Sequence, residues 1–445
     1  MRRIRAAVAT GTLLAACAAL LATAPSSQAA DAPGFHIQDG RLLDANNKDF
    51  VMRGVNHAHT WYPDKTDQAL KDIKAKGANT VRVVLATGDQ WAKNDTADVT
   101  KVVSQCKANR LICVLEAHDT TGYGEAGAAI PLSKAVDYWL SVKGALVGQE
   151  KYVLVNIGNE PHGNTNYTAW TNDTKSAISR LRSAGLGHTL MVDAPNWGQD
   201  WSFTMRDNAA DVLAADPDRN TLFDVHMYGV YDTPAEVSDY LNRFAAAKLP
   251  IVVGEFGDMH SDGNPDEDAI MATAQSKGIG YLGWSWSGNG GGVEYLDLVQ
   301  NFDASRLTDW GKRLFDGANG IKATAKEASV FGSDGGGTGP GACAVTYRLS
   351  DWGSSFNADV TLRNTSDKKI DGWELGFAFP GQQKINSVWN AKAVQSGAGV
   401  RITPESWTNS IPAGGTVSFG LSGSSTGANT APTSFTLDGR TCTAA

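Results

Sequence analysis

The chain has 445 residues, and its Asp and Glu residues outnumber its Lys and Arg residues by 47 to 39, for a formal net charge of −8. This length allows more than one domain. The acidic balance argues against a nucleic-acid-binding protein or one that binds anionic membranes, because both partners repel an acidic chain.

The start of the chain has the pattern of an export signal. Arginines precede the apolar stretch 6–24, and the small-residue sequence SSQAA follows it. We predict a signal peptide over residues 1–30, cleaved after Ala29 or Ala30, and hence a secreted, extracellular protein. A lipoprotein is the alternative, because the residues before Cys17 resemble a lipobox, but the apolar run continues past that cysteine. No other stretch is long and apolar enough to span a bilayer, so no membrane association is expected after cleavage.

Four cysteines follow residue 30, and an even number in an exported protein favours disulfides. Their spacing suggests the pairs Cys106–Cys113 and Cys343–Cys442, although the sequence permits three connectivities. Neither pair has the CxxC spacing or the nearby histidines of a zinc site. We therefore predict no metal site, and no cofactor is required.

Eight apolar, strand-like runs alternate with amphipathic helical segments through residues 31–331. The runs begin at Phe50, Asn79, Leu111, Tyr152, His188, Leu222, Pro250 and Tyr281. Segments such as TDQALKDIKAKGA and DVTKVVSQCKANR lie between them and have helical spacing of apolar residues. Eight β-then-α units predict an α/β fold, the (β/α)₈ TIM barrel. An open doubly wound sheet is the competitor, and the missing GxGxxG after the first run weakens it.

The rest of the chain differs in character. Residues 332–341 are Gly-rich without apolar anchors, which is typical of a flexible linker. Residues 342–445 contain short alternating stretches separated by Gly, Asn and Pro turns, which predict an all-β, antiparallel β-sandwich. Because Cys343 and Cys442 lie near its two ends, their disulfide would tie the first and last strands together.

A carboxylate ends the fourth strand-like run, YVLVNIGNE, at Glu160. Pro161 prevents simple continuation of the strand and is expected to keep Glu160 extended. A buried carboxylate costs several kcal/mol unless it is paired or used, so Glu160 is a candidate functional residue. The alternative is a glutamate that turns out to solvent at the strand end.

Active sites of TIM barrels are built at the C-terminal ends of the strands. The polar and aromatic residues expected there are Arg82, His118, Asp119, Asn159, Glu160, Asn196, Trp197, His226, Tyr228, Glu255, Trp284 and Trp286. Each alone is commonly structural: an arginine can pair with a carboxylate, and a histidine or tryptophan can fill a core. Strand alternation predicts Trp284 and Trp286 on one side.

Two glutamates, Glu160 and Glu255, follow similar apolar runs and suggest a pair. Cleavage of a glycosidic bond needs one carboxylic acid to protonate the leaving oxygen, and a second carboxylate to attack the anomeric carbon or activate water. Aromatic rings and hydroxyl-binding Asn, His and Arg suit a sugar, whose faces are apolar and whose rim is polar.

In order along the chain, Arg82, His118, Asn159-Glu160-Pro161, His226-x-Tyr228, Glu255 and Trp284 resemble the active-site signature of glycoside hydrolase family 5, over residues 35–325. The segments RGVNHAHTWY, LEAHDTTGYGE, APNWGQDW, DVHMYGVY and GWSWSGNGGGVEYLDLV resemble the secreted bacterial β-mannanases of that family more than its endoglucanases.

The resemblance implies that Glu160 is the general acid/base and Glu255 the nucleophile of a retaining enzyme. It implies that the side chains that bind substrate or support the glutamates are Arg82, His118, Asn159, Trp197, His226, Tyr228 and Trp284, with Trp286 as the alternative to Trp284. Because a nearby carboxylate raises its neighbour's pKa, Glu160 is expected to hold a proton while Glu255 is ionised.

The implied activity is that of an endo-β-1,4-mannanase (mannan endo-1,4-β-mannosidase), acting as a monomer on internal bonds of mannan, galactomannan and glucomannan. An endo-β-1,4-glucanase of the same family is the nearest alternative. A non-catalytic polysaccharide-binding protein is disfavoured, because both glutamates are present, and a structural cell-surface protein would need a sorting signal or lipid anchor.

The C-terminal part resembles a family 2 carbohydrate-binding module, through SDWGSSFNADVTLRNTS, IDGWELGFAFPG, SVWNAKA, ESWTNSIPAGGTVSFGL and APTSFTLDG. The resemblance implies that Trp352, Trp389 and Trp407 form a flat exposed strip, whereas Trp373 packs in the core. Three exposed rings would be an aggregation liability without a ligand. The expected partner is a crystalline cellulose or mannan surface.

Overall fold

The computed structural model describes residues 34–331, 343–366, 369–427, 429–438 and 440–444. The predicted signal peptide, residues 1–30, and the predicted linker, residues 332–341, lie outside the described residues and stay predictions. Within the described part of the chain, no helix combines the length and apolar character needed to cross a membrane.

Eight parallel strands close into a barrel in the order β10-β3-β4-β5-β6-β7-β8-β9. They are β3 (Arg53–His57), β4 (Thr80–Leu85), β5 (Ile112–Ala117), β6 (Val153–Asn156), β7 (Leu190–Asp193), β8 (Thr221–Met227), β9 (Ile251–Phe256) and β10 (Gly280–Gly283). Each predicted strand-like run contains or overlaps one of them, and β8 and β10 begin one residue before their runs. The closed barrel confirms the predicted fold and excludes the doubly wound sheet. Every residue of β4, β5 and β9 is buried, as expected for parallel strands covered on both faces.

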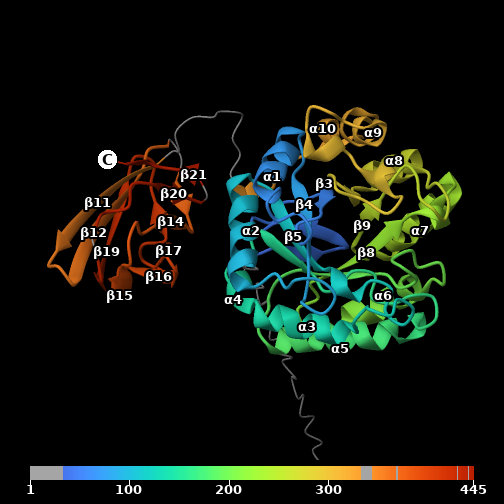
Figure 1. Ribbon diagram of the computed structural model, residues 1–445, viewed down its shortest axis with the longest axis horizontal. Coiled ribbons are helices and arrows are strands. Elements are labelled where there is room, and N and C mark those ends of the chain that lie inside the picture. Colours follow the sequence, from blue (N-terminus) through green and yellow to red (C-terminus); the bar gives the residue numbers. More distant parts are fainter. Residues whose placement is uncertain (1–33, 332–342, 367–368, 428, 439, 445) are drawn as a thin grey trace, which may run out of the picture. The chain divides into compact units, whose positions relative to one another are not determined.

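Helices surround the strands (Figure 1). They are α1 (Thr66–Ala75), α2 (Thr96–Ala108), α3 (Leu132–Ser141), α4 (Lys143–Leu146), α5 (Trp170–Ser183), α6 (Thr204–Ala215), α7 (Pro234–Ala247), α8 (Glu267–Lys277), α9 (Asp309–Asp316) and α10 (Ile321–Thr324). Short 3₁₀ turns are η1 (His118–Thr120), η2 (Tyr167–Ala169), η3 (Gly229–Tyr231), η4 (Glu294–Leu296), η5 (Gln300–Phe302) and η6 (Ser329–Phe331). A hairpin of β1 (His36–Gln38) and β2 (Arg41–Leu43) precedes the barrel. Apolar helix residues such as Leu70 and Ile73 of α1 are fully buried.

The eighth strand of the barrel ends earlier than the run that predicted it. Strand β10 ends at Gly283, so Trp284 and Trp286 lie beyond it, and the alternation that placed them on one side does not apply. Trp286 is fully buried and meets Phe315 of α9 edge to face, with ring centroids 6.2 Å apart. Trp284 is half-buried and stacks on His118 instead. The prediction that the two tryptophans share a side is wrong.

The C-terminal part contains two five-stranded sheets, β15-β19-β12-β11-β22 and β16-β17-β14-β20-β21, and the pair β13-β18. Their strands are β11 (Cys343–Asp351), β12 (Ser355–Asn364), β13 (Ile370–Asp371), β14 (Leu375–Ala378), β15 (Lys384–Trp389), β16 (Ala391–Ser396), β17 (Gly399–Pro404), β18 (Ser410–Ile411), β19 (Thr416–Ser424), β20 (Phe435–Leu437), β21 (Arg440–Thr441) and β22 (Thr443–Ala444). All pairs are antiparallel except β11 with β22. Trp373 is fully buried between the sheets, and its indole N–H donates to the carbonyl of Thr408 at 2.8 Å, so its predicted core position is confirmed.

One of the two expected disulfides is present. Cys343 and Cys442 are bonded, which ties β11 to the last part of the chain as predicted. Cys106, in α2, and Cys113, in β5, are both buried and free, and their Sγ atoms lie 3.1 Å apart. This separation exceeds the roughly 2.05 Å of a disulfide bond, so the structure contradicts the Cys106–Cys113 pair. The spacing correctly predicted that the two cysteines are neighbours, but they pack against each other as free thiols.

Candidate active site

Arg82, in β4, is a buried cation at the centre of the barrel's C-terminal end. Its guanidinium donates to five neighbours at 2.6–3.2 Å, namely Oδ1 of Asn56, Oδ1 of Asn156, Oδ1 of Asn159, Oδ2 of Asp193 and Oε1 of Glu255. Burial lowers the pKa of Arg82, but the surrounding carboxylates, first Glu116 and then Glu255, outweigh burial and raise it. Arg82 therefore stays charged and organises the groups around it.

Glu255, in β9, is held by two donors. Nη1 of Arg82 donates to its Oε1 at 2.7 Å, and the hydroxyl of Tyr228 donates to its Oε2 at 3.1 Å. Both bonds favour the ionised carboxylate. Burial acts in the opposite direction, outweighs the charges of His226 and Arg82, and raises the pKa of Glu255.

Glu160 lies in the loop after β6, which ends at Asn156. Its backbone has φ of 40°, in the left-handed region, so the extended conformation expected before Pro161 is wrong. Proline disfavours only the right-handed helical region at the preceding residue, and two hydrogen bonds hold the left-handed one. The N–H of Glu160 donates to Oδ2 of Asp193 at 3.1 Å, and its carbonyl accepts from the N–H of Gly122 at 2.9 Å.

This backbone turns the side chain of Glu160 back into the barrel, not out to solvent. Only 9% of Glu160 is exposed, and its Oε1 lies 2.7 Å from Nδ1 of His226. Ligand-capable atoms of Glu160, His226 and Glu255 all lie within 4.8 Å of one another. The structure thus brings the two predicted glutamates together as a pair.

His226, in β8, lies between this pair and two further carboxylates. Its Nδ1 also lies 3.6 Å from Oε2 of Glu255, and its Nε2 lies 3.4 Å from Oδ2 of Asp193 and 3.5 Å from Oδ2 of Asp224. Burial lowers the pKa of His226, but the carboxylates, first Glu255 and then Asp224, outweigh burial and raise it well above its usual value.

The pKa of Glu160 consequently differs from expectation. Burial raises it, but the hydrogen bond and the positive charge of His226 outweigh burial and lower it. We expected the neighbouring Glu255 to keep Glu160 protonated. The sequence placed His226 near the glutamates but did not show that it is charged. That positive charge lowers the pKa of Glu160, whereas the neighbouring carboxylate was expected to raise it.

An aromatic wall lies beside the carboxylates. His118 and Trp284 stack with ring centroids 5.8 Å apart and an interplanar angle of 19°, and Nδ1 of His118 lies 2.9 Å from Oε1 of Glu116. Trp61, which is 36% exposed, and Trp91 both contact the His118 ring. Burial lowers the pKa of His118, but the charge and hydrogen bond of Glu116 outweigh burial and raise it.

Asn159 and Trp197 also lie in loops at this end of the barrel. One amide N–H of Asn159 donates to the hydroxyl of Thr121 at 2.9 Å, which leaves its second N–H for another acceptor. The indole of Trp197 donates to Oε2 of Glu125 at 2.7 Å, and its backbone N–H donates to the carbonyl of His162. Trp197 is half-buried, so part of its ring remains available for contact.

Five functional residues were missed by sequence reasoning: Asn56, Glu116, Asn156, Asp193 and Asp224. All five are at most 1% exposed, and each makes a hydrogen bond or ion pair with a predicted residue, namely Arg82, His118 or His226. A signal was available for all but Asn56, because each of the other four is a polar side chain within or at the end of a strand of mostly apolar residues. Asp224 and His226 are two apart in one strand, which places both on the same face.

Two groups of residues have the donor atoms of a metal site: Glu160, His226 and Glu255, and Asp193, Asp224 and His226. Neither fits a resident cation, because Arg82 already bonds Glu255 and Asp193. A metal ion there would face the guanidinium at close range. The donor set is that of an acid–base network.

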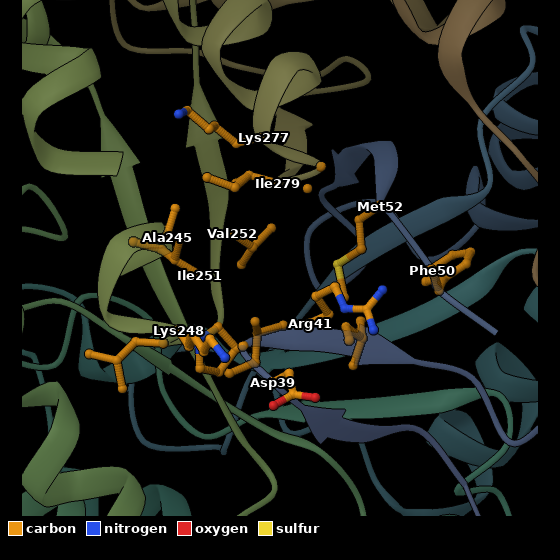
Figure 2. A pocket seen from close by; sticks show the side chains of 17 residues that line it. Asp39, Arg41, Phe50, Met52, Ala245, Lys248, Ile251, Val252, Lys277 and Ile279 are labelled. Carbon is orange, nitrogen blue, oxygen red and sulfur yellow. The ribbon is translucent and has the colours of Figure 1, made fainter. Parts of the chain in front are cut away.

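A cavity of about 250 Å³ lies at the opposite end of the barrel. It is lined by Met52 and by the first residues of the strands, such as Ile251 of β9 and Gly280 of β10, and by the loop of the β1–β2 hairpin. Figure 2 shows Lys248, Arg41 and Asp39 around it and no paired catalytic carboxylates. Groups at this end of a TIM barrel serve stability, so the cavity is not the catalytic site.

Comparison with known proteins agrees with this geometry. Residues 43–290 match the model of the cellulases of glycosyl hydrolase family 5. The chain belongs to glycosyl hydrolase family 5. Residues 343–442 of this family 5 protein match the model of a cellulose binding domain, which agrees with the β-sheet architecture of that part.

Two relatives of this family 5 protein carry the same name. A mannan endo-1,4-β-mannosidase of Streptomyces lividans is 64% identical over 345 residues, which are 76% of this chain and 90% of the relative. A second, from Cellvibrio japonicus, is 47% identical over 374 residues, 84% of this chain and 83% of the relative. The mannohexaose complex of a β-mannanase from Thermomonospora fusca is 58% identical with a TM-score of 0.65, covering 67% of this chain and 99% of that structure.

Proposed function

We propose that this family 5 glycosidase is a secreted endo-β-1,4-mannanase that hydrolyses internal β-1,4-mannosidic bonds of mannan, galactomannan and glucomannan. The observation that carries the proposal is the pair of buried carboxylates, Glu160 and Glu255, with oxygens within 4.8 Å of each other and with different partners. The mannanase names of the relatives support the choice of mannan over glucan.

The partners divide the chemistry between the two glutamates. Glu255 receives Arg82 and Tyr228, which hold one of its oxygens in place to attack the anomeric carbon. Glu160 contacts His226, whose imidazole can give and take protons. Such a partner suits a general acid, which must give up a proton and regain it. Glu160 protonates the leaving oxygen as Glu255 forms the ester, and then takes a proton from the water that cleaves the ester.

The separation of the glutamates supports hydrolysis with retention. Retaining enzymes hold their carboxyl groups roughly 5–5.5 Å apart, whereas inverting enzymes need roughly 6.5–9.5 Å to admit a water molecule. Oxygens of Glu160 and Glu255 within 4.8 Å of each other fit the shorter, retaining separation. The reaction therefore passes through a covalent glycosyl-enzyme intermediate.

The remaining predicted side chains form the sugar site. His118 and Trp284 line the cleavage subsite, the free amide N–H of Asn159 reaches the 2-hydroxyl, and Trp197 is a further platform. A hydrogen-bonding site of this kind discriminates strongly between substrates that differ in one hydroxyl. Mannose and glucose differ at the 2-hydroxyl, so the surroundings of Asn159 select between mannan and cellulose.

The C-terminal module anchors the enzyme to crystalline cellulose or mannan. Trp352, Trp389 and Trp407 are 62%, 41% and 71% exposed, which is unusual for tryptophan without a ligand. The match to a cellulose binding domain supports this role. Export through residues 1–30 and action as a monomer complete the proposal.

The test is the release of reducing sugar by the full chain on unsubstituted mannan, galactomannan, carboxymethylcellulose and xylan. We expect much faster release of reducing sugar from the two mannans than from the other polysaccharides. NMR spectroscopy of the products should show that the β-anomer is released first. Preference for carboxymethylcellulose would make the protein an endoglucanase, and release of the α-anomer first would overturn retention.

Glu255→Ala is the control that ties activity to this site. We expect it to abolish hydrolysis, whereas Glu160→Ala spares only substrates with good leaving groups. Inactivity of the unmodified chain on every polysaccharide, with intact adsorption to cellulose, would instead favour a binding protein.

A further inference from the structure

The imidazole of His226 faces carboxylates through both of its nitrogens. Nδ1 lies 2.7 Å from Oε1 of Glu160 and 3.6 Å from Oε2 of Glu255. Nε2 lies 3.4 Å from Oδ2 of Asp193 and 3.5 Å from Oδ2 of Asp224. A neutral imidazole has one acceptor nitrogen, whose lone pair would point at a carboxylate here. The geometry therefore calls for a proton on each nitrogen.

The charges around His226 also call for bound protons. Four carboxylates face it, from Glu160, Asp193, Asp224 and Glu255, and Arg82 is the permanent cation bonded to Asp193 and Glu255. Tyr228 donates to Glu255, and His118 lies on the aromatic side of the site. One guanidinium does not balance four buried carboxylates, so protons must be held among these groups.

No catalytic step above uses Asp193, which already bonds Arg82 and Asn156, or Asp224. Asp224 lies in β8 two residues before His226, and its Oδ1 accepts from the N–H of Gly254 at 2.6 Å. A Cβ atom at Gly254 would lie 2.0 Å from Asp224 Oδ2, so glycine leaves space for this carboxylate. Neither Oδ2 of Asp224 nor Nε2 of His226 has a hydrogen-bond partner among the described residues. The two orphaned atoms face each other.

We propose that Asp224 is a positioning residue that keeps one proton on Nε2 of His226, so that Nδ1 of His226 can supply the proton that Glu160 gives to the leaving sugar. The proposal rests on the glycosidase function described above. It makes His226 the proton store of the reaction, with Asp224 setting its tautomer as the aspartate of a Ser-His-Asp triad does.

The protons balance through the cycle. In the empty site His226 is cationic and Glu160 anionic. When a sugar excludes water, the neutral pair is favoured, so the Nδ1–H bond of His226 breaks and an O–H bond forms on Oε1 of Glu160. Glu255 then bonds the anomeric carbon while the glycosidic bond breaks and its oxygen takes that proton. Water cleaves the ester, its proton passes to Glu160 and returns to Nδ1, and Glu255 leaves as a carboxylate.

The test compares Asp224→Asn with the unmodified full chain on two substrates. Mannohexaose has a poor leaving group and needs the proton, whereas a dinitrophenyl β-mannobioside does not. In Asp224→Asn the side-chain amide N–H faces Nε2 of His226, so Nε2 must act as an acceptor and carry no proton. The neutral ring then holds its one proton on Nδ1 and cannot give it to Glu160, which stays ionised. We expect kcat/KM on mannohexaose to fall about 100-fold or more, and kcat/KM on the dinitrophenyl substrate to change by less than about threefold.

Asp200→Asn is the matched control. Asp200 is also a fully buried carboxylate that accepts two backbone N–H bonds, but it contacts Tyr240, Met205 and Arg206, away from His226. Its kcat/KM ratio between the two substrates should equal that of the unmodified chain. Equal losses on both substrates in Asp224→Asn, or no loss on either, would overturn the proposal.

Nitrogen NMR of ring-labelled histidine gives a readout that does not need activity. His226 is assigned by its absence from the spectrum of His226→Gln. We expect two protonated nitrogens at neutral pH in the unmodified chain, and a neutral ring with its proton on Nδ1 in Asp224→Asn. A neutral His226 in the unmodified chain would overturn the proposal, whereas failure to cleave any mannan would overturn only the proposed function.

Discussion

Arg82 and Glu255 form a buried ion pair in which Nη1 donates to Oε1 at 2.7 Å, and neither side chain is more than 6% exposed. The same guanidinium bonds Asp193, so one cation serves both the expected nucleophile and the carboxylate that holds the backbone of Glu160. Removing this cation should therefore affect both stability and chemistry.

Arg82→Met should lower the free energy of unfolding by about 3–5 kcal/mol, because it leaves carboxylates buried without their partner. It should also raise the pKa of Glu255 further, so the nucleophile is ionised only at higher pH. The acid limb of the pH profile of kcat/KM should then move to higher pH. Urea unfolding and pH profiles on galactomannan measure the two effects, and an unmoved acid limb would contradict the role of Arg82.

The stability of the barrel should depend on pH through Asp200. Burial raises the pKa of Asp200 from 3.8 to about 6, despite hydrogen bonds from Tyr240 and two backbone N–H groups. A carboxyl group with a raised pKa binds its proton more tightly in the folded chain, so stability falls as pH rises from about 4 to about 6. Asp200→Asn cannot lose a proton, so its stability relative to the unmodified chain should improve by about 3 kcal/mol over this window. The measurement is the free energy of urea unfolding of both proteins between about pH 4 and about pH 6. A difference between them that does not change with pH would refute this prediction.

The free thiols of Cys106 and Cys113 can be counted. Both are buried, and burial, followed by the contact with Cys106, raises the pKa of Cys113 well above its usual value, so the folded protein should not react with a thiol reagent. After denaturation without reductant, residues 31–445 should release two thiols per chain. A count of zero would mean that these cysteines are oxidised in solution, as their spacing suggested.

The disulfide between Cys343 and Cys442 should be important for the module, because it closes a loop with a sequence separation of 99. Replacing both cysteines with alanine should destabilise the module by about 4 kcal/mol. Calorimetry of the full chain should then show the transition of the module at lower temperature, with the barrel transition unchanged. A shift of the barrel transition instead would mean that the module and the barrel do not unfold independently, which would contradict this prediction.

The exposed tryptophans of the module should determine adsorption and not catalysis. Trp389→Ala, in β15, should weaken binding to crystalline cellulose about tenfold or more, because large aromatic side chains dominate contact surfaces. Hydrolysis of soluble mannan should not change. Val394→Ala is the matched control, because Val394 is 64% exposed but lies in β16, which belongs to the other five-stranded sheet. Equal losses in both variants, measured by depletion from solution, would argue against the strip.

By itself, the sequence determined the barrel, the β-sandwich and the two glutamates. Apolar runs alternating with amphipathic segments specify parallel strands covered by helices, and a carboxylate at the end of such a run lies at the strand end or in the loop that follows it. The tryptophan positions in short polar turns and the terminal cysteines of the module were similarly readable, because burial and chain ends constrain them locally.

Only the tertiary structure decided how the site is charged and which way its side chains point. The left-handed backbone of Glu160 depends on a hydrogen bond to Asp193 and one from Gly122, which are distant in sequence. The separation of Trp284 from Trp286 depends on where β10 ends, and the unbonded state of Cys106 and Cys113 depends on packing. The lowered pKa of Glu160 depends on His226, whose charge comes from four carboxylates on different elements. A pKa depends on all the charges that folding brings near a group, and those charges come from distant parts of the chain. A local sequence pattern therefore cannot predict it.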